Sequence, residues 1–203
     1  MIQRGTIPIE TERTILRPFT PEDVSDLHEI FSDEETMRRC EPPYSLETTA
    51  TFLEEFCIRR QGALACALKD TGKVIGYLLC RNLGTGDGQG LDDVYEVGWF
   101  FNRSYWRQGF ACESMFALLA HLFEEEKAHK VFAETVDTKK SVALMKKLGM
   151  IEEGVQRKQA RTNDGIYCDL YLYGLLREEY RPQGESCEYK DRISQGQLNR
   201  RKP

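Results

Sequence analysis

The spacing of apolar side chains predicts helices near the start of the chain, then strands, and then an alternation of both. A first strand is expected over 10–17. Thr20 followed by Pro21 indicates a helix start, because threonine caps helices well and proline suits the first turn, and the apolar positions of 24–31 share one helical face. Ser45 predicts the start of a second helix over 46–60.

The pattern changes to strands after residue 62. Two apolar runs, 63–69 and 73–82, are joined by Asp70-Thr71-Gly72, which is typical of a hairpin. The glycine-rich stretch 84–90 lacks the spacing of a nucleotide-binding loop, so we interpret it as a flexible connector to a fourth strand over 93–101.

The remaining pattern alternates, and it completes a mixed sheet of the α/β or α+β class. Gly149 predicts the end of a short helix. The expected elements are a helix over 110–127, a strand over 130–136, a helix over 141–148, and strands over 150–158 and 165–175. We expect one domain over 1–180 and a polar C-terminal tail over 181–203.

Composition narrows the functional classes. The 203 residues are 40% hydrophobic and carry a net charge of -5, which argues against a nucleic-acid surface. No membrane span or signal peptide is recognisable, so we expect a cytoplasmic protein, as a monomer or homodimer. The 7 cysteines include no C-x-x-C pair and the 3 histidines show no ligand spacing, so reduced thiols and no metal are expected.

One segment has the features of an anion site. The predicted strand 93–101 runs through a short turn into a long helix, with Gly109 where the backbone must tighten. The free N–H groups of a first helical turn and the helix dipole favour a phosphate or pyrophosphate there. Arg103 and Arg107 add positive charge beside that turn.

These residues resemble a known family. The sequence Tyr105-Trp106-Arg107-Gln108-Gly109-Phe110-Ala111 is similar to the acetyl-CoA pyrophosphate loop of the GNAT N-acetyltransferases, and to its form in the RimJ/RimL-like branch. The stretches 14–23, 141–150 and 164–173 also match that branch in the right order, so the resemblance covers about 11–180.

The resemblance implies a fold and a co-substrate. The fold would be a mixed, mostly antiparallel sheet of about seven strands, splayed between the fourth and fifth, with about four flanking helices. Acetyl-CoA would bind in the splay, its pantetheine arm along the fourth strand and its pyrophosphate on the loop. The implied contacts are Trp99, Phe100, Phe101, Trp106, Arg107, Gln108, Gly109, Phe110, Ala111, Thr138 and Ser141.

Catalytic candidates follow from the chemistry of acyl transfer, which needs a base for the amine and a proton for the thiolate. Glu96 lies in an apolar strand, where burial favours a raised pKa, and Glu134 is the second choice. The alternative is that Glu96 faces solvent or supports a loop. Met145 stands where many members of the family have a tyrosine that protonates the thiolate. Ser141, one turn earlier, is left as the proton donor, and the alternative is that Ser141 only caps the short helix.

The sequence therefore predicts an acetyl-CoA-dependent N-acetyltransferase that acts on a primary amine by direct attack in a ternary complex. The acceptor is a protein N-terminus or a small molecule, bound near 31–49 and 159–167. The departures at Trp106, Thr138 and Met145 leave a second interpretation, a non-catalytic acyl-CoA sensor or scaffold.

Overall fold

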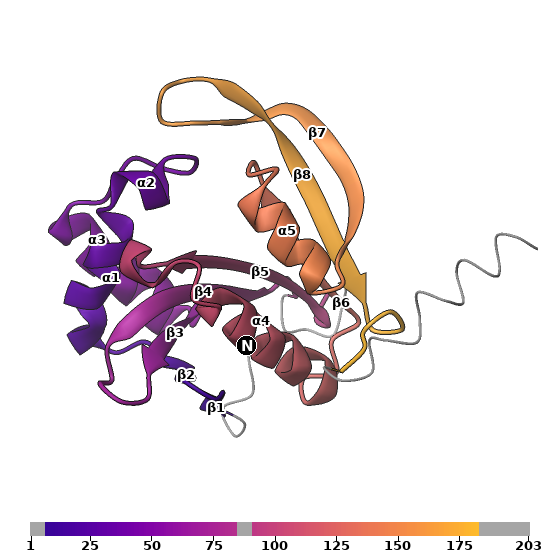
Figure 1. Ribbon diagram of the computed structural model, residues 1–203, viewed down its shortest axis with the longest axis horizontal. Coiled ribbons are helices and arrows are strands. Elements are labelled where there is room, and N and C mark those ends of the chain that lie inside the picture. Colours follow the sequence, from indigo (N-terminus) through magenta and orange to yellow (C-terminus); the bar gives the residue numbers. More distant parts are fainter. Residues whose placement is uncertain (1–6, 85–90, 183–203) are drawn as a thin grey trace, which may run out of the picture.

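A curved sheet of eight strands organises the molecule in the computed structural model, which describes residues 7–84 and 91–182 (Figure 1). The strand order is β1-β2-β3-β4-β5-β6-β8-β7, and among the described strands only β5 and β6 pair in parallel. The strands are β1 (Ile9–Glu10), β2 (Thr14–Pro18), β3 (Ala63–Leu68), β4 (Val74–Asn82), β5 (Val94–Phe101), β6 (Lys130–Thr135), β7 (Ile151–Arg161) and β8 (Tyr167–Leu176).

Helices cover both faces of this sheet. They are α1 (Val24–Phe31), α2 (Glu34–Met37), α3 (Leu46–Phe52), α4 (Phe110–Glu124) and α5 (Lys140–Lys147), with short 3-10 turns at Pro21–Asp23 and Arg103–Tyr105. Ser45 caps α3 as expected, its hydroxyl accepting from the N–H of Thr48. A π-helical segment, Leu53–Arg59, continues α3, so the predicted helix over 46–60 is present but changes type midway.

Two hydrophobic cores lie on opposite faces of the sheet. On one face, Leu118 and Leu122 of α4 and Met145 of α5 are buried against the strands. On the other face, α1, α3 and the π-helical segment bury Leu27 and Leu53 against β3 and β4. The amphipathic pattern that predicted these helices therefore corresponds to two separate interfaces.

The sheet splays between β5 and β6. These strands pair only from Val94↔Lys130 to Glu96↔Phe132, and the rest of β5 has no strand partner on that side among the described residues. Figure 1 shows β7 and β8, in orange, curving away from β5, with their connecting loop near α2. The splay between the fourth and fifth predicted strands is thus confirmed.

The expected fold is confirmed with corrected counts. The first predicted strand, over 10–17, is two short antiparallel strands, because Thr11 and Thr14 close a tight connection between them. Helix α2 was missed, because a helix of 4 residues is too short to show a periodic pattern. The connector residues 85–90 and most of the predicted tail, 183–203, lie outside the described residues.

Within the described part of the chain, no helix combines the length and apolar character that crossing a membrane requires.

Candidate active site

The turn before α4 presents a row of free backbone N–H groups. Within the described residues, none of the N–H groups of 107–112 donates to a backbone or side-chain acceptor, and the first helical bond runs from the Glu113 N–H to the Gly109 carbonyl (3.0 Å). Arg107 (φ 60°) and Gly109 (φ 88°) both have left-handed backbone, which turns successive N–H groups toward one side. Such a row at a helix N-terminus suits a phosphate.

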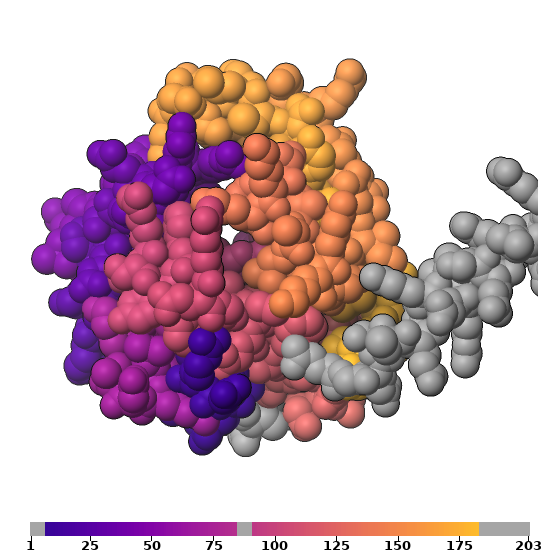
Figure 2. Space-filling view, in the orientation of Figure 1, coloured from indigo at the N-terminus to yellow at the C-terminus, as the bar shows by residue number. Residues whose placement is uncertain are grey.

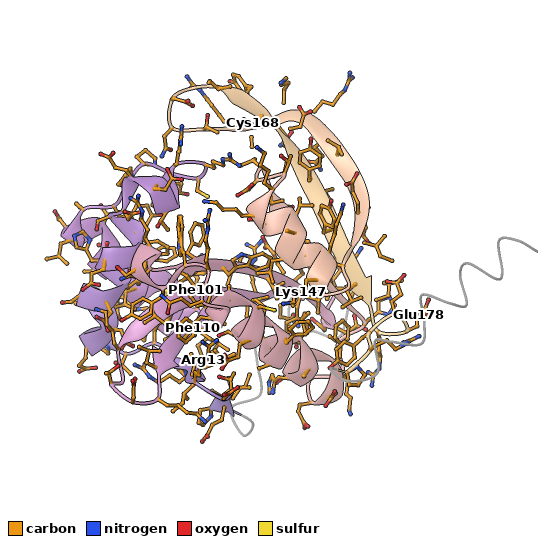
Figure 3. The ribbon with its side chains drawn as sticks, in the orientation of Figure 1. Arg13, Phe101, Phe110, Lys147, Cys168 and Glu178 are labelled. Atoms are coloured by element: carbon orange, nitrogen blue, oxygen red, sulfur yellow. The ribbon has the colours of Figure 1, made fainter. Side chains whose placement is uncertain are left out.

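Arg13, on the connection between β1 and β2, fixes this turn from behind. Its Nη1 donates to the Gln108 carbonyl (3.0 Å), and its Nε donates to the Glu113 carboxylate (2.7 Å). The guanidinium lies over the Phe110 ring, 4.1 Å from its centroid, and Figure 3 shows the two residues close together. With the Gln108 carbonyl held by Arg13, the adjacent N–H groups remain available to a ligand.

Glu113 is the centre of this anchor. Burial alone would raise the pKa of its carboxyl, but hydrogen bonds from the Thr11 hydroxyl (2.6 Å) and from the Arg13 N–H (2.8 Å) and guanidinium outweigh that effect. The pKa of Glu113 is therefore lowered, and the carboxylate stays charged at neutral pH.

Trp106 has a structural contact in the same turn. Its indole N–H donates to the Phe101 carbonyl at the end of β5 (2.7 Å), so this group is already used within the protein. The ammonium of Lys140, at the start of α5, lies 4.5 Å from the Trp106 ring centroid. The turn before α4 and the start of α5 therefore meet across the splay.

The far half of β5 exposes backbone groups at the splay. The N–H of Asn102 donates to the Ile75 carbonyl and that of Leu83 to the Val94 carbonyl, which means that even-numbered residues of β5 bond to β4. Phe100 therefore points its backbone groups toward β4, whereas Trp99 and the N–H of Phe101 point toward the side from which β6 has diverged.

At the start of α5, the cap differs from the one that the sequence suggested. The Asp137 carboxylate accepts from the N–H groups of Lys139 (2.9 Å) and Lys140 (3.1 Å), so it takes the capping role that was one alternative for Ser141. Ser141 lies inside the first turn, half-buried, and Thr138 is exposed beside it. Met145 is buried in the core and presents no acidic group to the splay.

The two candidate carboxylates share one face of the sheet. Glu96 pairs with Phe132, and Glu134 lies two positions further along β6, so both side chains point to the side opposite α4. Arg81 of β4, directly opposite Glu96, forms an ion pair with it. Partial loss of solvent and the charge of Glu96 raise the pKa of Glu134, while Arg81 opposes this rise.

The segment 33–41, which contains α2, forms a strap across the open end of the splay. Three ion pairs and two hydrogen bonds hold it: Arg39 to Asp137 (3.0 Å), Asp33 to Arg103 (3.7 Å), Glu35 to Lys140 (3.9 Å), and the Asn163 amide to the carbonyls of Met37 (3.0 Å) and Glu41 (2.9 Å). Figure 2 shows a hollow in the surface between the turn before α4, in pink, and the start of α5, in orange.

The sequence predicted the turn, Glu96, Glu134 and Ser141 as site residues. In the structure Glu96 and Glu134 lie where β5 and β6 diverge, and Ser141 follows Lys140, which contacts Trp106 of the turn. The sequence did not predict roles for Arg13, Arg81 or the strap. These contacts join residues far apart in sequence, such as Arg13 with Glu113 or Asn163 with Met37, and no local pattern signals them.

Comparison with known proteins identifies the family. A model described as an acetyltransferase (GNAT) domain matches residues 13–151. The uncharacterized N-acetyltransferase YnaD of Bacillus subtilis (strain 168) is 28% identical over 175 residues, which are 85% of this chain and 98% of that protein.

Solved structures agree with this match. A GNAT-family acetyltransferase from Bacillus anthracis has a TM-score of 0.75 at 27% identity, covering 85% of this chain and 100% of that one. Mycobacterium smegmatis RimJ, solved with CoA-disulfide, shares the fold with a TM-score of 0.68 at 20% identity, covering 82% and 83%. This chain is an acyltransferase and belongs to the GNAT acetyltransferase family.

Proposed function

We propose that this protein transfers an acetyl group from acetyl-CoA to a primary amine, on a protein N-terminus or a small molecule, within a ternary complex. The observation that carries the proposal is the row of N–H groups over 107–112, which have no acceptor among the described residues. A pyrophosphate would accept from them at the positive end of the α4 dipole. RimJ, a fold neighbour, was solved with CoA-disulfide, which supports the same co-substrate here.

The unpaired edge of β5 suits the pantetheine arm. That arm carries amides, and the backbone groups of Trp99 and Phe101 that face the splay are amide donors and acceptors as well. Thr138 and Ser141 lie within two residues of Lys140, whose ammonium contacts the Trp106 ring across the splay. The thioester would then lie between β5 and α5.

An acceptor that arrives as an ammonium loses one proton to free its lone pair and a second as the amide forms, and the departing thiolate takes up one, so the reaction releases one net proton. The amine nitrogen forms a bond to the thioester carbonyl carbon, and the carbon–sulfur bond breaks. Glu96, directly or through a water, takes the proton from the amine, and the Ser141 hydroxyl protonates the departing thiolate. Met145, at the position of the tyrosine in many relatives, is buried in the core, which leaves Ser141 as the hydroxyl within the first turn of α5.

Calorimetry with acetyl-CoA and chromatographic detection of released CoA test this proposal. Acetyl-CoA should bind with saturation, and CoA release should depend on an added peptide or small amine. Glu96→Gln and Ser141→Ala should each lower kcat by about 100-fold, since general acid–base groups contribute roughly 10²–10⁴-fold, with acetyl-CoA affinity within about threefold of wild type.

Ser25→Ala is a matched control, because Ser25 is an exposed serine of α1 on the other side of the sheet. Its turnover should equal that of the wild type. Absence of acetyl-CoA binding would overturn the proposal entirely. Binding without CoA release across the amine panel would leave an acyl-CoA-binding module in its place.

A further inference from the structure

The ion pair between Arg81 and Glu96 lies where an acceptor amine would have to arrive. Arg81, Glu96 and Glu134 come from three neighbouring strands, β4, β5 and β6, and the strand registers place all three on the face opposite α4. Glu96 is also the last residue of β5 that pairs with β6, so this ion pair marks the point where the sheet opens. A group placed there faces the splay from the side of the sheet opposite α4.

The charges at this point are unbalanced. Two carboxylates share one guanidinium, which gives a local charge of about -1 at neutral pH. Arg81 is paired with Glu96, whereas Glu134, on an exposed position, has no ion pair or hydrogen bond among the described residues. The raised pKa of Glu134, caused first by loss of solvent and then by Glu96, has the direction expected of a carboxylate without a cation.

Arg81 is the more exposed partner of the ion pair with Glu96. Its side chain is 53% exposed, while that of Glu96 is 17% exposed, so the guanidinium sits at the solvent side of the pair. The guanidinium end of the pair remains in contact with water, so an arriving cation of similar charge can replace it on the Glu96 carboxylate at small cost. The Arg81 side chain thus shows that the Glu96 carboxylate accepts a cationic nitrogen in the free protein.

Space for such a cation exists beside the pair. Gly98, the next residue of β5 on this face, carries no side chain, and a Cβ there would reach only ordinary contact with Leu79 at 3.5 Å. Beyond it the Phe100 and Tyr77 rings form an aromatic wall, with centroids 6.0 Å apart. An acidic floor next to aromatic rings is an environment that favours ammonium groups.

We propose that the acceptor binds as a primary ammonium between Glu96 and Glu134, and that Arg81 occupies its place on Glu96 until the acceptor displaces it. This inference rests on the proposed acetyl transfer and adds the acceptor class, a cationic amine without a neighbouring carboxylate. It makes Arg81 a specificity-determining residue, because neutral or acidic acceptors cannot compete with a guanidinium for a carboxylate.

Calorimetry on CoA-saturated protein tests the inference without any turnover. The probe is alanyl-alaninamide, which has a free N-terminal ammonium and no carboxylate, and its N-acetylated form is the matched ligand without the charge. Alanyl-alaninamide should bind the wild type and the acetylated form should not. Arg81→Gln should bind the probe about fivefold more tightly, and Glu134→Gln about tenfold more weakly, since both change the local charge by one unit.

Matched variants separate this role from a structural one. Arg81→Lys restores a cation beside Glu96 and should return the affinity to within about twofold of wild type. Arg59→Gln removes an arginine that pairs with Glu54 and Glu55 on its own helical segment, and Glu125→Gln removes an exposed carboxylate of the α4 end. Both should leave probe affinity unchanged.

An affinity of Arg81→Gln equal to or weaker than wild type would overturn the inference, as would equal binding of the acetylated probe. If Arg81→Gln does not fold, Glu134→Gln, a substitution at an exposed position, tests the inference in its place. An affinity of Glu134→Gln for the probe equal to that of the wild type would then overturn the inference. Failure of acetyl-CoA to bind would be a separate result: it refutes the proposed function, and the same probe titrations on the protein without CoA then report on the three charged residues.

Discussion

The two halves of β5 differ in a way that separates stability from function. From Val94 to Glu96 the strand is paired on both sides, with β4 and with β6. From Val97 to Phe101 it keeps only β4, although the sequence continues with the same apolar character. A single strand therefore provides sheet pairing in its first half and free backbone and side-chain space in its second half.

The open half is not left unsupported. Its last carbonyl, that of Phe101, accepts from the Trp106 indole, and Asn102 donates through its side chain to Glu29 of α1 (2.9 Å). Phe100 contributes its ring to the aromatic cluster with Phe31 and Tyr77. The protein thus fixes the ends of the open half, while its middle, around Gly98 and Trp99, pairs with β4 and has no strand partner on the β6 side among the described residues.

Filling the open half of β5 with a larger side chain should have the largest effect on activity. Gly98→Val places methyl groups between Glu96 and Phe100, where we expect acetyl-CoA and acceptor to meet, and kcat/KM should fall by about 100-fold because a misplaced reacting group costs roughly that much. The melting temperature should change little, because the first side-chain carbon makes only ordinary contact with Leu79.

Gly154→Val is the control for this variant. Gly154 is a strand glycine of β7, and a Cβ there meets nothing within 4 Å. Its activity should match the wild type. Equal losses in both variants would mean that the open half of β5 has no special role.

Straining the turn before α4 should have the next largest effect. Gly109→Ala forces a side chain onto a residue with φ 88°, with its Cβ 3.4 Å from the Arg13 guanidinium that holds the turn. We expect about tenfold weaker acetyl-CoA binding by calorimetry. The free energy of unfolding should fall by about 1 kcal/mol, the usual cost of left-handed backbone in L-residues.

Gly72→Ala separates strain from binding. Gly72 has φ 73° in the β3–β4 hairpin and open space around it, so the same substitution costs a similar free energy of unfolding far from the turn. Acetyl-CoA affinity should stay at the wild-type value. If Gly72→Ala weakened binding as much as Gly109→Ala, the effect would be one of global stability.

These two glycines also show what the sequence can predict. Gly109 was placed correctly because a strand, a glycine and a helical pattern follow each other within one short segment. The hairpin at Gly72 was placed for the same local reason. The splay was expected only from the family resemblance, because pairing between β5 and β6 depends on strands separated by the whole of α4.

The charged contacts of the site could not be predicted. Glu96 was expected to gain its role from burial, but its partner Arg81 is set by the register of β4 against β5. Ser141 was the candidate cap of α5, but the Asp137 carboxylate accepts the N–H bonds there instead. Periodicity fixes which face a residue occupies, while the choice of partner on that face depends on tertiary packing.

Loosening the strap should have a smaller effect than either glycine variant. Arg39→Ala removes the 3.0 Å ion pair with Asp137, which joins the segment 33–41 to the loop before α5. Because exposed pairs contribute below about 1 kcal/mol, we expect KM for the acceptor to rise about threefold with kcat nearly unchanged. Arg59→Ala, which loses ion pairs with Glu54 and Glu55 of its own helical segment, is the control, and an equal rise there would refute a role for the strap.

The smallest expected effect is the contribution of Glu113 to the stability of the folded protein at acidic pH. The pKa of Glu113 is lower in the folded protein than in the unfolded chain, so its contribution to stability is fully present above the unfolded value, near 4.5, and is lost as pH falls through the folded value. Glu113→Gln should lower the melting temperature at pH 7 by about 2–4 °C, because the lost charged hydrogen bonds to Arg13 and Thr11 stabilise by roughly 1 kcal/mol.

The difference between wild type and Glu113→Gln should shrink as the pH falls below the unfolded value, near 4.5, and through the lower folded pKa, because the wild-type carboxyl then takes up a proton and loses its advantage. Calorimetric melting between pH 3 and 7 measures this directly, with Glu125→Gln, an exposed position at the other end of α4, as the control. A difference that stayed constant with pH would show that Glu113 acts through packing. The anchor behind the turn would then depend on the Arg13 contacts with Gln108 and Phe110 alone.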